Sequence, residues 1–207
     1  MADTDMETGF SELEPAGRLA LLRQFVKNPK GIASVAPSGQ KLANLMASIV
    51  PEDANRIIEV GAGTGVITEA ILRRGFLPSA LFAVEMNPTL YRMLLSRFAS
   101  IHVACGDARN LVSMTRGWRN DRDDVDAICS SLGLLTMDRN IRDEILAAAF
   151  SVLRPGGVFV QYTYGFKCPL GAVTRKRFQL EHHPVGFAWL NLPPARVFVY
   201  RQVRASR

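Results

Sequence analysis

Cysteine is scarce in this sequence of 207 residues, where only Cys105, Cys129 and Cys168 occur. The three positions are far apart and form no C-x-x-C pair, which argues against a disulfide scaffold and against a zinc module. A chain of this length buries a large core without either kind of cross-link. The scarcity of cysteine is typical of a protein from a reducing compartment.

Long apolar runs are also missing. No stretch approaches the roughly 18–20 residues that span a bilayer, and the longest candidate, Ile145–Leu153, is about half that length. The first 15 residues carry five acidic residues and no Lys or Arg, the reverse of the basic start of a signal peptide. We therefore expect a soluble, cytoplasmic protein.

Acidic residues are almost absent from two parts of the chain. Residues 16–50 contain five basic and no acidic residues, and residues 165–207 contain eight basic residues and one acidic residue. The formal net charge is +6, while the centre of the chain, residues 51–164, is almost neutral. Two basic flanks favour an anionic partner, either nucleic acid or an acidic membrane surface, although a role in solubility alone stays open.

Three regions are expected along the chain. Residues 1–15 are predicted to form a flexible acidic tail. Residues 16–50 are predicted to form a basic, amphipathic helical segment that contacts a membrane or covers the substrate, because apolar residues recur at helical spacing over residues 16–27. Docking of that first helix on the domain core is the alternative. Residues 51–207 are predicted to form the third region, a folded domain.

Strand-like and helix-like segments alternate over most of this domain. The order predicts an α/β fold whose mostly parallel sheet is covered by helices on both faces. Two late strand candidates follow each other without a long helix, which predicts an antiparallel hairpin at the sheet edge. The expected strands are residues 56–60, 80–85, 101–105, 125–129, 158–162, 177–183 and 196–202. The expected helices are residues 66–74, 88–98, 108–115 and 140–152, with a further helix that begins after Pro37-Ser38.

A glycine-rich turn, Gly61-Ala62-Gly63-Thr64-Gly65, separates the first expected strand from the next helix. Closely spaced glycines let a ligand approach the backbone, and the helix N-terminus beyond them can receive an anionic group. Tight strand–helix turns also need glycine, so the turn by itself does not identify a ligand. A dinucleotide fingerprint would need glycine in place of Val66, which disfavours NAD and FAD.

Acidic residues accompany this turn at the ends of successive strands. Glu59 precedes the turn, Glu85 closes the second expected strand, and Asp107 follows the third. The carboxyl ends of parallel strands meet at one edge of a sheet, so these side chains are expected to converge. A carboxylate at the end of the second strand can accept both hydroxyl groups of a ribose. For Asp107, a helix cap is the alternative role.

The sequences Glu-Val-Gly-Ala-Gly-Thr-Gly, Val-Glu-Met-Asn-Pro, Gly-Asp-Ala and Leu-Arg-Pro-Gly-Gly occur in this order. Together they resemble the class I S-adenosylmethionine-dependent methyltransferases over most of residues 55–164. The resemblance implies a Rossmann-like, seven-stranded sheet with an antiparallel last strand, S-adenosyl-L-methionine as cofactor and S-adenosyl-L-homocysteine as product. No metal is expected, since the cysteines form no zinc motif and His182-His183 lacks a third ligand. It also implies that the glycines lie near the methionine part of the cofactor, Glu85 near its ribose and Asp107 near its adenine amino group. The implied cofactor contacts are Glu59, Gly61, Ala62, Gly63, Thr64, Gly65, Glu85, Met86, Asp107, Ala108 and Ser130.

The segments on either side of these motifs point to one group of methyltransferases. Residues 25–38 and 191–197 resemble the small soluble bacterial phospholipid N-methyltransferases. This resemblance implies methylation of phosphatidylethanolamine, and of its mono- and dimethyl forms, toward phosphatidylcholine. The implied partners are phosphatidylethanolamine and anionic lipids, with peripheral binding at the inner face of the membrane. Residues 51–207 would then be the methyltransferase domain.

Methylation of an amine requires a neutral nitrogen, and an alkylammonium group has a pKa near that of lysine, ~10.4. A phenol, an imidazole or a chain of water molecules could take the proton. Tyr164, just past the fifth expected strand, is the first candidate, and its ring could also hold methylated ammonium groups. His183 on the expected hairpin is the second candidate.

Two other functions stay open. An RNA or rRNA adenine methyltransferase would use the same cofactor core, with basic flanks for the phosphate backbone. Such enzymes carry an Asn/Asp-Pro-Pro-aromatic motif after the fourth strand, where this chain reads Cys129-Ser-Ser-Leu-Gly-Leu134, so a nucleic-acid partner is disfavoured. The other function is a binding module without activity, which the intact glycine turn and the two acids after it disfavour.

Overall fold

The computed structural model describes residues 37–119, 125–164, 167–188 and 194–203. The chain divides into two units, Met1–Ala36 and Pro37–Arg207, and only the second contains described residues. The expected acidic tail and the amphipathic helix within residues 16–27 lie outside the described residues. Within the described ranges, no helix is long and apolar enough to cross a membrane.

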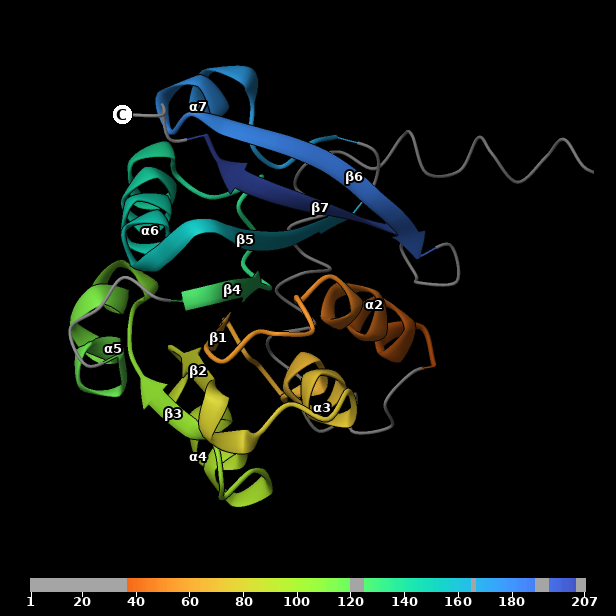
Figure 1. Ribbon diagram of the computed structural model, residues 1–207, viewed down its shortest axis with the longest axis vertical. Coiled ribbons are helices and arrows are strands. Elements are labelled where there is room, and N and C mark those ends of the chain that lie inside the picture. Colours follow the sequence, from red (N-terminus) through yellow and green to blue (C-terminus); the bar gives the residue numbers. More distant parts are fainter. Residues whose placement is uncertain (1–36, 120–124, 165–166, 189–193, 204–207) are drawn as a thin grey trace, which may run out of the picture. The chain divides into compact units, whose positions relative to one another are not determined.

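A seven-stranded sheet forms the centre of the described unit, with the strand order β3-β2-β1-β4-β5-β7-β6 (Figure 1). Strands β1 to β5 run parallel, β7 runs antiparallel to β5, and β6 runs antiparallel to β7. The expected parallel sheet with a terminal antiparallel hairpin is therefore confirmed. The strands are β1 (Ile57–Val60), β2 (Leu81–Glu85), β3 (His102–Cys105), β4 (Val125–Ser130), β5 (Leu153–Tyr164), β6 (Leu180–Ala188) and β7 (Ala195–Gln202).

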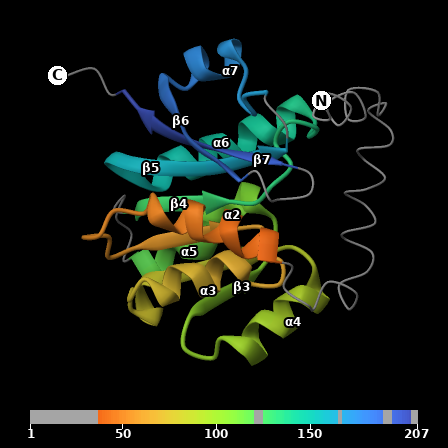
Figure 2. The same cartoon turned by 90° about the vertical axis from the view of Figure 1, so that its right-hand side faces the viewer.

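Helices cover both faces of this sheet (Figures 1 and 2). Buried side chains of α2, α3 and α4 pack on one face, and those of α5 and α6 pack on the other, with α7 beside β6. The helices are α2 (Pro37–Ser48), α3 (Val66–Arg73), α4 (Pro88–Arg97), α5 (Leu111–Arg119), α6 (Arg139–Val152) and α7 (Ala172–Arg177), with short 3-10 turns η1 (Pro78–Ala80) and η2 (Ala108–Asn110).

The central strands are buried on both faces, which explains why their sequences are almost continuously apolar. Every residue of β1, β2 and β4 is buried, whereas β3 at the sheet edge is partly exposed. Parallel sheets between two layers of helices have this property. The few polar residues in the buried strands therefore stand out, and two of them, Glu85 and Ser130, are the last residues of their strands.

Strand β5 begins at Leu153, directly after α6 and earlier than the sequence predicts. The buried Asp126 carboxylate accepts hydrogen bonds from the backbone N–H groups of Asn55 and Arg56, at 2.8 and 2.9 Å. The same carboxylate binds the guanidinium group of Arg154. The contact between Asp126 and Arg154 holds the residues after α6 against β4. The chain therefore becomes extended directly after the helix ends.

Strand β6 begins later than expected, since α7 occupies the residues before it. The predicted strand start at residue 177 is therefore wrong. The Arg177 guanidinium binds the buried Asp143 of α6 at 2.7 Å, and Arg142 of α6 donates to the Thr174 hydroxyl at 3.1 Å. These contacts with a distant helix stabilise α7, and nothing in its own sequence reveals them.

Helix α2 belongs to the folded unit. Its residues Leu42, Met46 and Ala47 are buried in the core on the α3 side of the sheet. Leu45 lies against Gly186 of β6, where a Cβ atom would be 3.1 Å from the leucine side chain. Of the predicted basic segment, residues 16–36 lie outside the described residues, and α2 packs on the domain.

We expect Gly65→Ala to destabilise the protein more than Gly75→Ala does. Both glycines have left-handed φ angles, 82° and 90°. A Cβ at Gly75 would meet no atom within 4 Å, whereas a Cβ at Gly65 would lie 2.3 Å from the ring of Phe98 and 2.9 Å from Leu94. Backbone strain alone costs about 1 kcal/mol, and the overpacking at Gly65 adds about 1–3 kcal/mol. Urea unfolding measures both losses, and equal losses would contradict the packing argument.

Candidate functional site

The turn between β1 and α3 follows a left-handed path at three positions. The φ angles of Gly61, Gly63 and Gly65 are 74°, 58° and 82°, which residues with a Cβ atom rarely adopt. Two successive N–H groups, beginning with that of Gly61, donate to the Val84 carbonyl of β2 at 2.8 and 3.1 Å. A Cβ at Gly61 would lie 2.9 Å from the side chain of Leu132. The turn is therefore held between β2 and the loop after β4.

Glu85, the last residue of β2, points its carboxylate at this turn. One oxygen accepts a hydrogen bond from the Gly63 N–H and the other from the Asn87 N–H, each at 2.8 Å. The residue is only 8% exposed. Each carboxylate oxygen keeps a further lone pair, so the group is held in a position to accept hydroxyl groups. This geometry suits the expected ribose contact.

Asp107, after β3, reaches the same edge of the sheet. The Gly106 N–H donates to the Glu85 carbonyl at 3.1 Å, which joins the end of β3 to the end of β2. The Asp107 carboxylate accepts the Arg109 N–H at 2.9 Å and so caps η2. Hydrogen bonds from the Arg109 side chain and backbone lower the pKa of Asp107 below its usual range. The cap that the sequence suggested as an alternative is present, and the acid also lies beside the end of β2.

Glu59 is completely buried within β1. The Thr68 hydroxyl donates to one carboxyl oxygen, and the other oxygen has no partner among the described residues. Burial, with a smaller contribution from the negative charge of Glu85, raises the pKa of Glu59 to about 8. A buried acceptor without a donor favours a ligand or water molecule that donates a hydrogen bond at this position.

Ser130 and Gln161 are paired neighbours at the carboxyl ends of β4 and β5, and each is 1% exposed. The Gln161 amide nitrogen donates to the carbonyls of Leu132 and Tyr162, at 2.9 and 2.7 Å. Its amide oxygen is buried without a partner among the described residues. Gln161 thus ties the loop after β4 to β5. Sequence reasoning missed this residue, although a lone amide in an apolar strand was a signal for it.

The remaining expected cofactor contacts lie at the same edge. Met86 follows Glu85 and is 69% exposed, whereas Ala62 and Ala108 are buried. The Thr64 carbonyl accepts a hydrogen bond from the Arg97 guanidinium at 2.8 Å. In the part of the chain that the structure describes, no group of three or more His, Cys, Asp or Glu residues could hold a metal ion.

Tyr164, the last residue of β5, is partly buried beside Tyr162 on the α2 side of the sheet. The two rings meet edge to face, with centroids 5.4 Å apart and an interplanar angle of 77°. The Tyr162 hydroxyl donates to Tyr164, and burial raises the pKa of both phenols. Tyr164 therefore offers a neutral hydroxyl oxygen rather than a phenolate.

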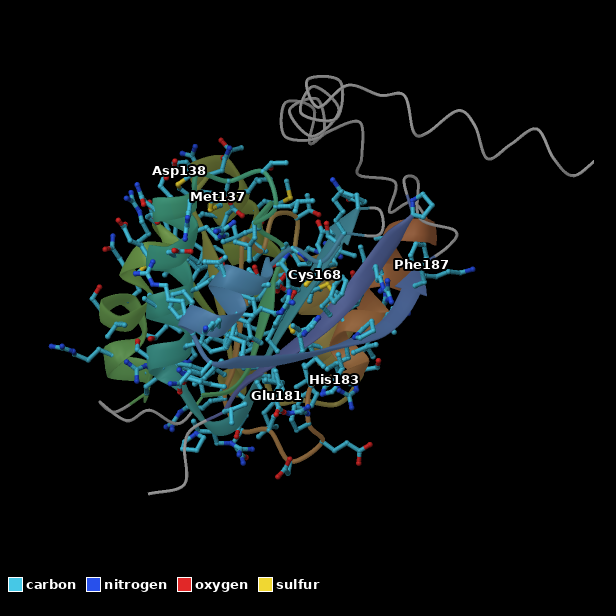
Figure 3. All side chains as sticks on the ribbon, turned by 90° about the horizontal axis from the view of Figure 1, so that it is seen from above. Met137, Asp138, Cys168, Glu181, His183 and Phe187 are labelled. Atoms are coloured by element: carbon cyan, nitrogen blue, oxygen red, sulfur yellow. The ribbon has the colours of Figure 1, made fainter. Side chains whose placement is uncertain are left out.

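His183 lies apart from this aromatic pair. It is exposed on the edge strand β6 and pairs with Val199, which pairs with Val160 of β5. Tyr164 instead aligns with Ala195 at the other end of β7. Figure 3 shows His183 at the rim of the molecule near Glu181. The structure therefore does not bring His183 and Tyr164 together.

Residues 57–157 match the sequence family described as "Methyltransferase domain". This part of the chain, just under half of it, is similar to a methyltransferase domain. Solved structures share its fold over most of the chain. A TehB-like S-adenosylmethionine-dependent methyltransferase from Corynebacterium glutamicum is 18% identical, with a TM-score of 0.62 over 92% of this chain and 100% of that one. The 1,6-didemethyltoxoflavin-N1-methyltransferase of Burkholderia thailandensis is 16% identical, with a TM-score of 0.64 over 93% of this chain and 92% of that one.

One curated protein is similar over almost its whole length. The ornithine lipid N-methyltransferase of Singulisphaera acidiphila is 29% identical over an alignment of 191 residues, which covers 89% of this chain and 96% of that protein. The aligned length extends well beyond the methyltransferase domain. The similarity therefore includes segments on its flanks.

The residues at the strand ends fit S-adenosyl-L-methionine, the cofactor that the sequence motifs imply. Protein side chains leave no room for a Cβ atom at Gly61 and Gly65, whereas a Cβ atom at Gly63 would meet only the Gly61 carbonyl oxygen, at 3.9 Å. A ligand can therefore approach the backbone at Gly63. Glu85 presents carboxylate oxygens beside the turn, and Glu59 keeps an unpartnered buried oxygen within β1. Anionic and acceptor groups suit a cofactor that carries hydroxyl, amino and sulfonium groups.

We expect Glu85→Ala to remove most cofactor affinity, whereas Tyr164→Phe keeps the affinity and lowers turnover. Glu85 presents both carboxylate oxygens at the glycine turn, and Tyr164 lies on a different strand. Loss of charged hydrogen bonds weakens binding by about 2–3 kcal/mol. Calorimetry with S-adenosyl-L-homocysteine measures affinity, and methyl transfer measures turnover. Equal losses of affinity in the two variants would overturn the assignment to Glu85, and unaltered turnover would remove the role of the Tyr164 phenol.

We expect folding stability to depend on pH through Glu59. Since burial raises its pKa from 4.5 to about 8, the folded state holds a proton that the unfolded state releases in this range. The stability that Glu59 contributes is complete below pH 4.5 and is lost as the pH rises to 8, by at most about 1.4 kcal/mol per pH unit. The variant Glu59→Gln should therefore gain stability relative to the unmodified protein as the pH rises through this window. Urea unfolding without cofactor measures the difference, and a constant difference would show that Glu59 is ionised in the folded protein.

Proposed function

We propose that this methyltransferase N-methylates the amine of a membrane lipid headgroup, with phosphatidylethanolamine and its mono- and dimethyl forms as the first candidates. The observation that carries the proposal is the similarity to ornithine lipid N-methyltransferase, which spans 96% of that protein. An ornithine lipid is the second candidate, favoured by the name of that relative. Both candidates carry an amine at the membrane surface, and phosphatidylcholine would be the end product from phosphatidylethanolamine.

The bound cofactor supplies a methyl group on a positively charged sulfur atom. The side chains of this site supply position, because in-line attack by a neutral amine needs little else. Glu85 and the glycine turn orient the ligand beside β1 and β2, while Gln161 holds the loop after β4 through the Leu132 carbonyl. We propose that Gln161 supports the loop after β4, which would face the methyl acceptor.

The acceptor amine must lose a proton before it reacts. Tyr164 is the first candidate to accept a hydrogen bond from this amine. Its hydroxyl oxygen accepts one hydrogen bond from Tyr162 and keeps a second lone pair for the amine. Burial raises the pKa of Tyr164, so the neutral phenol positions the amine and the proton passes on to water. The edge-to-face rings also offer faces to a methylated ammonium group. His183, exposed on the edge strand, is the second candidate and would act through intervening water.

A lipid substrate requires work at a membrane surface, and we propose peripheral binding at the cytoplasmic face. Residues 165–207 carry eight basic residues and one acidic residue. Each basic residue near an anionic surface contributes roughly 1 kcal/mol to binding. The basic residues at positions 16–36 would add to this attraction, although they lie outside the described residues.

RNA is the competing substrate, because basic flanks also suit a phosphate backbone. The segment after β4 reads Ser130-Ser131-Leu132-Gly133 and lacks the Asn/Asp-Pro-Pro-aromatic motif. Here Leu132 packs over Gly61 instead of presenting an aromatic ring to a base. We therefore propose the lipid and treat RNA as an outcome of the test.

Methyl transfer from radiolabelled S-adenosyl-L-methionine tests this function. We expect label in vesicles that contain phosphatidylethanolamine, resolved by chromatography into mono-, di- and trimethylated lipids. Parallel reactions contain ornithine lipid vesicles, phosphatidylcholine vesicles as a lipid without a free amine, or structured RNA. Label in ornithine lipid alone would move the proposal to the second candidate, and label in RNA alone would overturn it.

A further inference from the structure

Arg109 folds back on the residue that caps its own turn. Its Nε and Nη2 atoms both donate to one carboxylate oxygen of Asp107, at 3.0 and 2.8 Å. The other Asp107 oxygen accepts the backbone N–H of Arg109 at 2.9 Å. With one oxygen held by the guanidinium group and the other by a backbone N–H, both ends of the carboxylate are restrained, and its orientation is fixed.

Among the described residues, these contacts leave one place free on the Asp107 carboxylate. Each carboxylate oxygen can accept about two hydrogen bonds. The oxygen that receives the guanidinium fork has both places filled, while the oxygen that caps η2 has one place left. A single N–H from a ligand can therefore be accepted without displacing Arg109.

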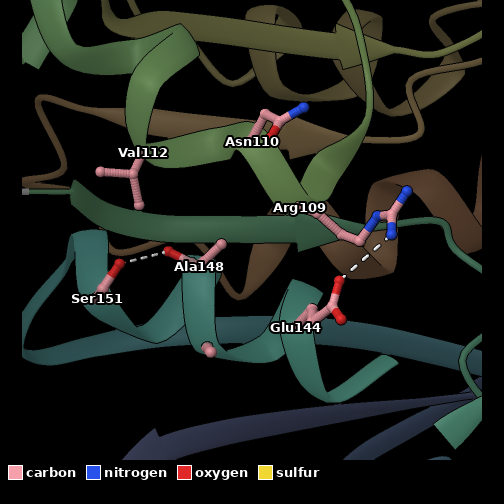
Figure 4. A pocket seen from close by; sticks show the side chains of 7 residues that line it. Arg109, Asn110, Val112, Glu144, Ala148 and Ser151 are labelled. Carbon is pink, nitrogen blue, oxygen red and sulfur yellow. Dashed lines mark hydrogen bonds and ion pairs between the residues drawn. The ribbon is translucent and has the colours of Figure 1, made fainter. Parts of the chain in front are cut away.

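A second acid holds the far side of the guanidinium group. Arg109 Nη1 lies 3.3 Å from the Glu144 carboxylate of α6, across the groove shown in Figure 4. Val112, Ala148 and Ser151 also line this groove. The Arg109 side chain is 43% exposed, so the contact with α6 adds a restraint that the short turn η2 lacks by itself.

We propose that Arg109 is a positioning residue for cofactor recognition, which holds the Asp107 carboxylate in the orientation that accepts the adenine amino group. The proposal rests on the adenine contact expected of Asp107, and it is independent of the methyl acceptor. Without the fork, Asp107 would keep its helix cap but could rotate about it. Recognition of the amino group would then weaken, while contacts to the rest of the cofactor would remain.

The test compares two ligands that differ only at the base. S-adenosyl-L-homocysteine carries an amino group at the edge of the base, and S-inosyl-L-homocysteine carries a carbonyl oxygen there. For Arg109→Ala we expect affinity for the adenine ligand to fall about five-fold, as for one partly lost hydrogen bond, and affinity for the inosine ligand to stay constant. Arg109→Lys keeps the charge but not the fork, and should show the same selective loss. Calorimetry measures both ligands, and thermal unfolding checks that each variant is folded.

Two controls separate this role from a structural one. Asp107→Asn should reduce affinity for the adenine ligand, relative to the inosine ligand, more than the Arg109 variants do. This control tests the adenine contact itself. Arg73→Ala removes an exposed arginine from an ion pair with Glu69 at the far end of α3 and should change neither affinity. Equal losses for both ligands in the Arg109 variants, or no loss, would overturn the proposal. Tighter binding of the adenine ligand would also overturn it, since the fork would then compete with adenine.

Discussion

The left-handed turn between β1 and α3 is the constraint on which the rest of the site depends. Its first two N–H groups bind the Val84 carbonyl, so the turn is fixed to β2. Glu85, the next residue of β2, accepts a further hydrogen bond from the turn, donated by the Gly63 N–H. Gly65 lies so close to Phe98 that α4 can pack there only against a residue without a side chain. Since Leu132 covers Gly61 from the other side, one turn sets the distance between β2, α4 and the loop after β4.

Three carboxyl groups gather around this turn, and the protein holds each by a different physical means. Backbone N–H groups hold Glu85, an arginine fork holds Asp107, and burial beside a hydroxyl group holds Glu59 largely protonated at neutral pH. Like charges at one edge of a sheet repel, so the neutral Glu59 lowers the cost of placing the other two nearby. The outcome is one edge of the sheet at which neutral and charged carboxyl groups lie together, suited to a ligand whose amino, hydroxyl and sulfonium groups are spread over its length.

The region that we propose for the methyl acceptor is built differently, from aromatic and amide groups rather than charged groups. The rings of Tyr162 and Tyr164 meet edge to face. The amide nitrogen of Gln161 donates hydrogen bonds to two backbone carbonyl groups. In the proposed function, uncharged surroundings would disfavour an ammonium group over the neutral amine, because a buried cation loses its hydration. The excess of basic residues is found instead in the flanking sequence segments, residues 16–50 and 165–207, and would favour an anionic surface.

Local sequence determined the alternation of strands and helices, the glycine turn and the acids after β2 and β3, because backbone conformation and apolar burial act over a few residues. It also determined the antiparallel hairpin, although not where β6 begins. Only tertiary structure decided that α7 forms, since Arg177 finds Asp143 on another helix, and that β5 starts at Leu153, since Asp126 binds Arg154. The same holds for Gln161 and for the separation of His183 from Tyr164, which depend on strand pairing. Register and ion pairs join residues far apart in the chain, so no local pattern contains them.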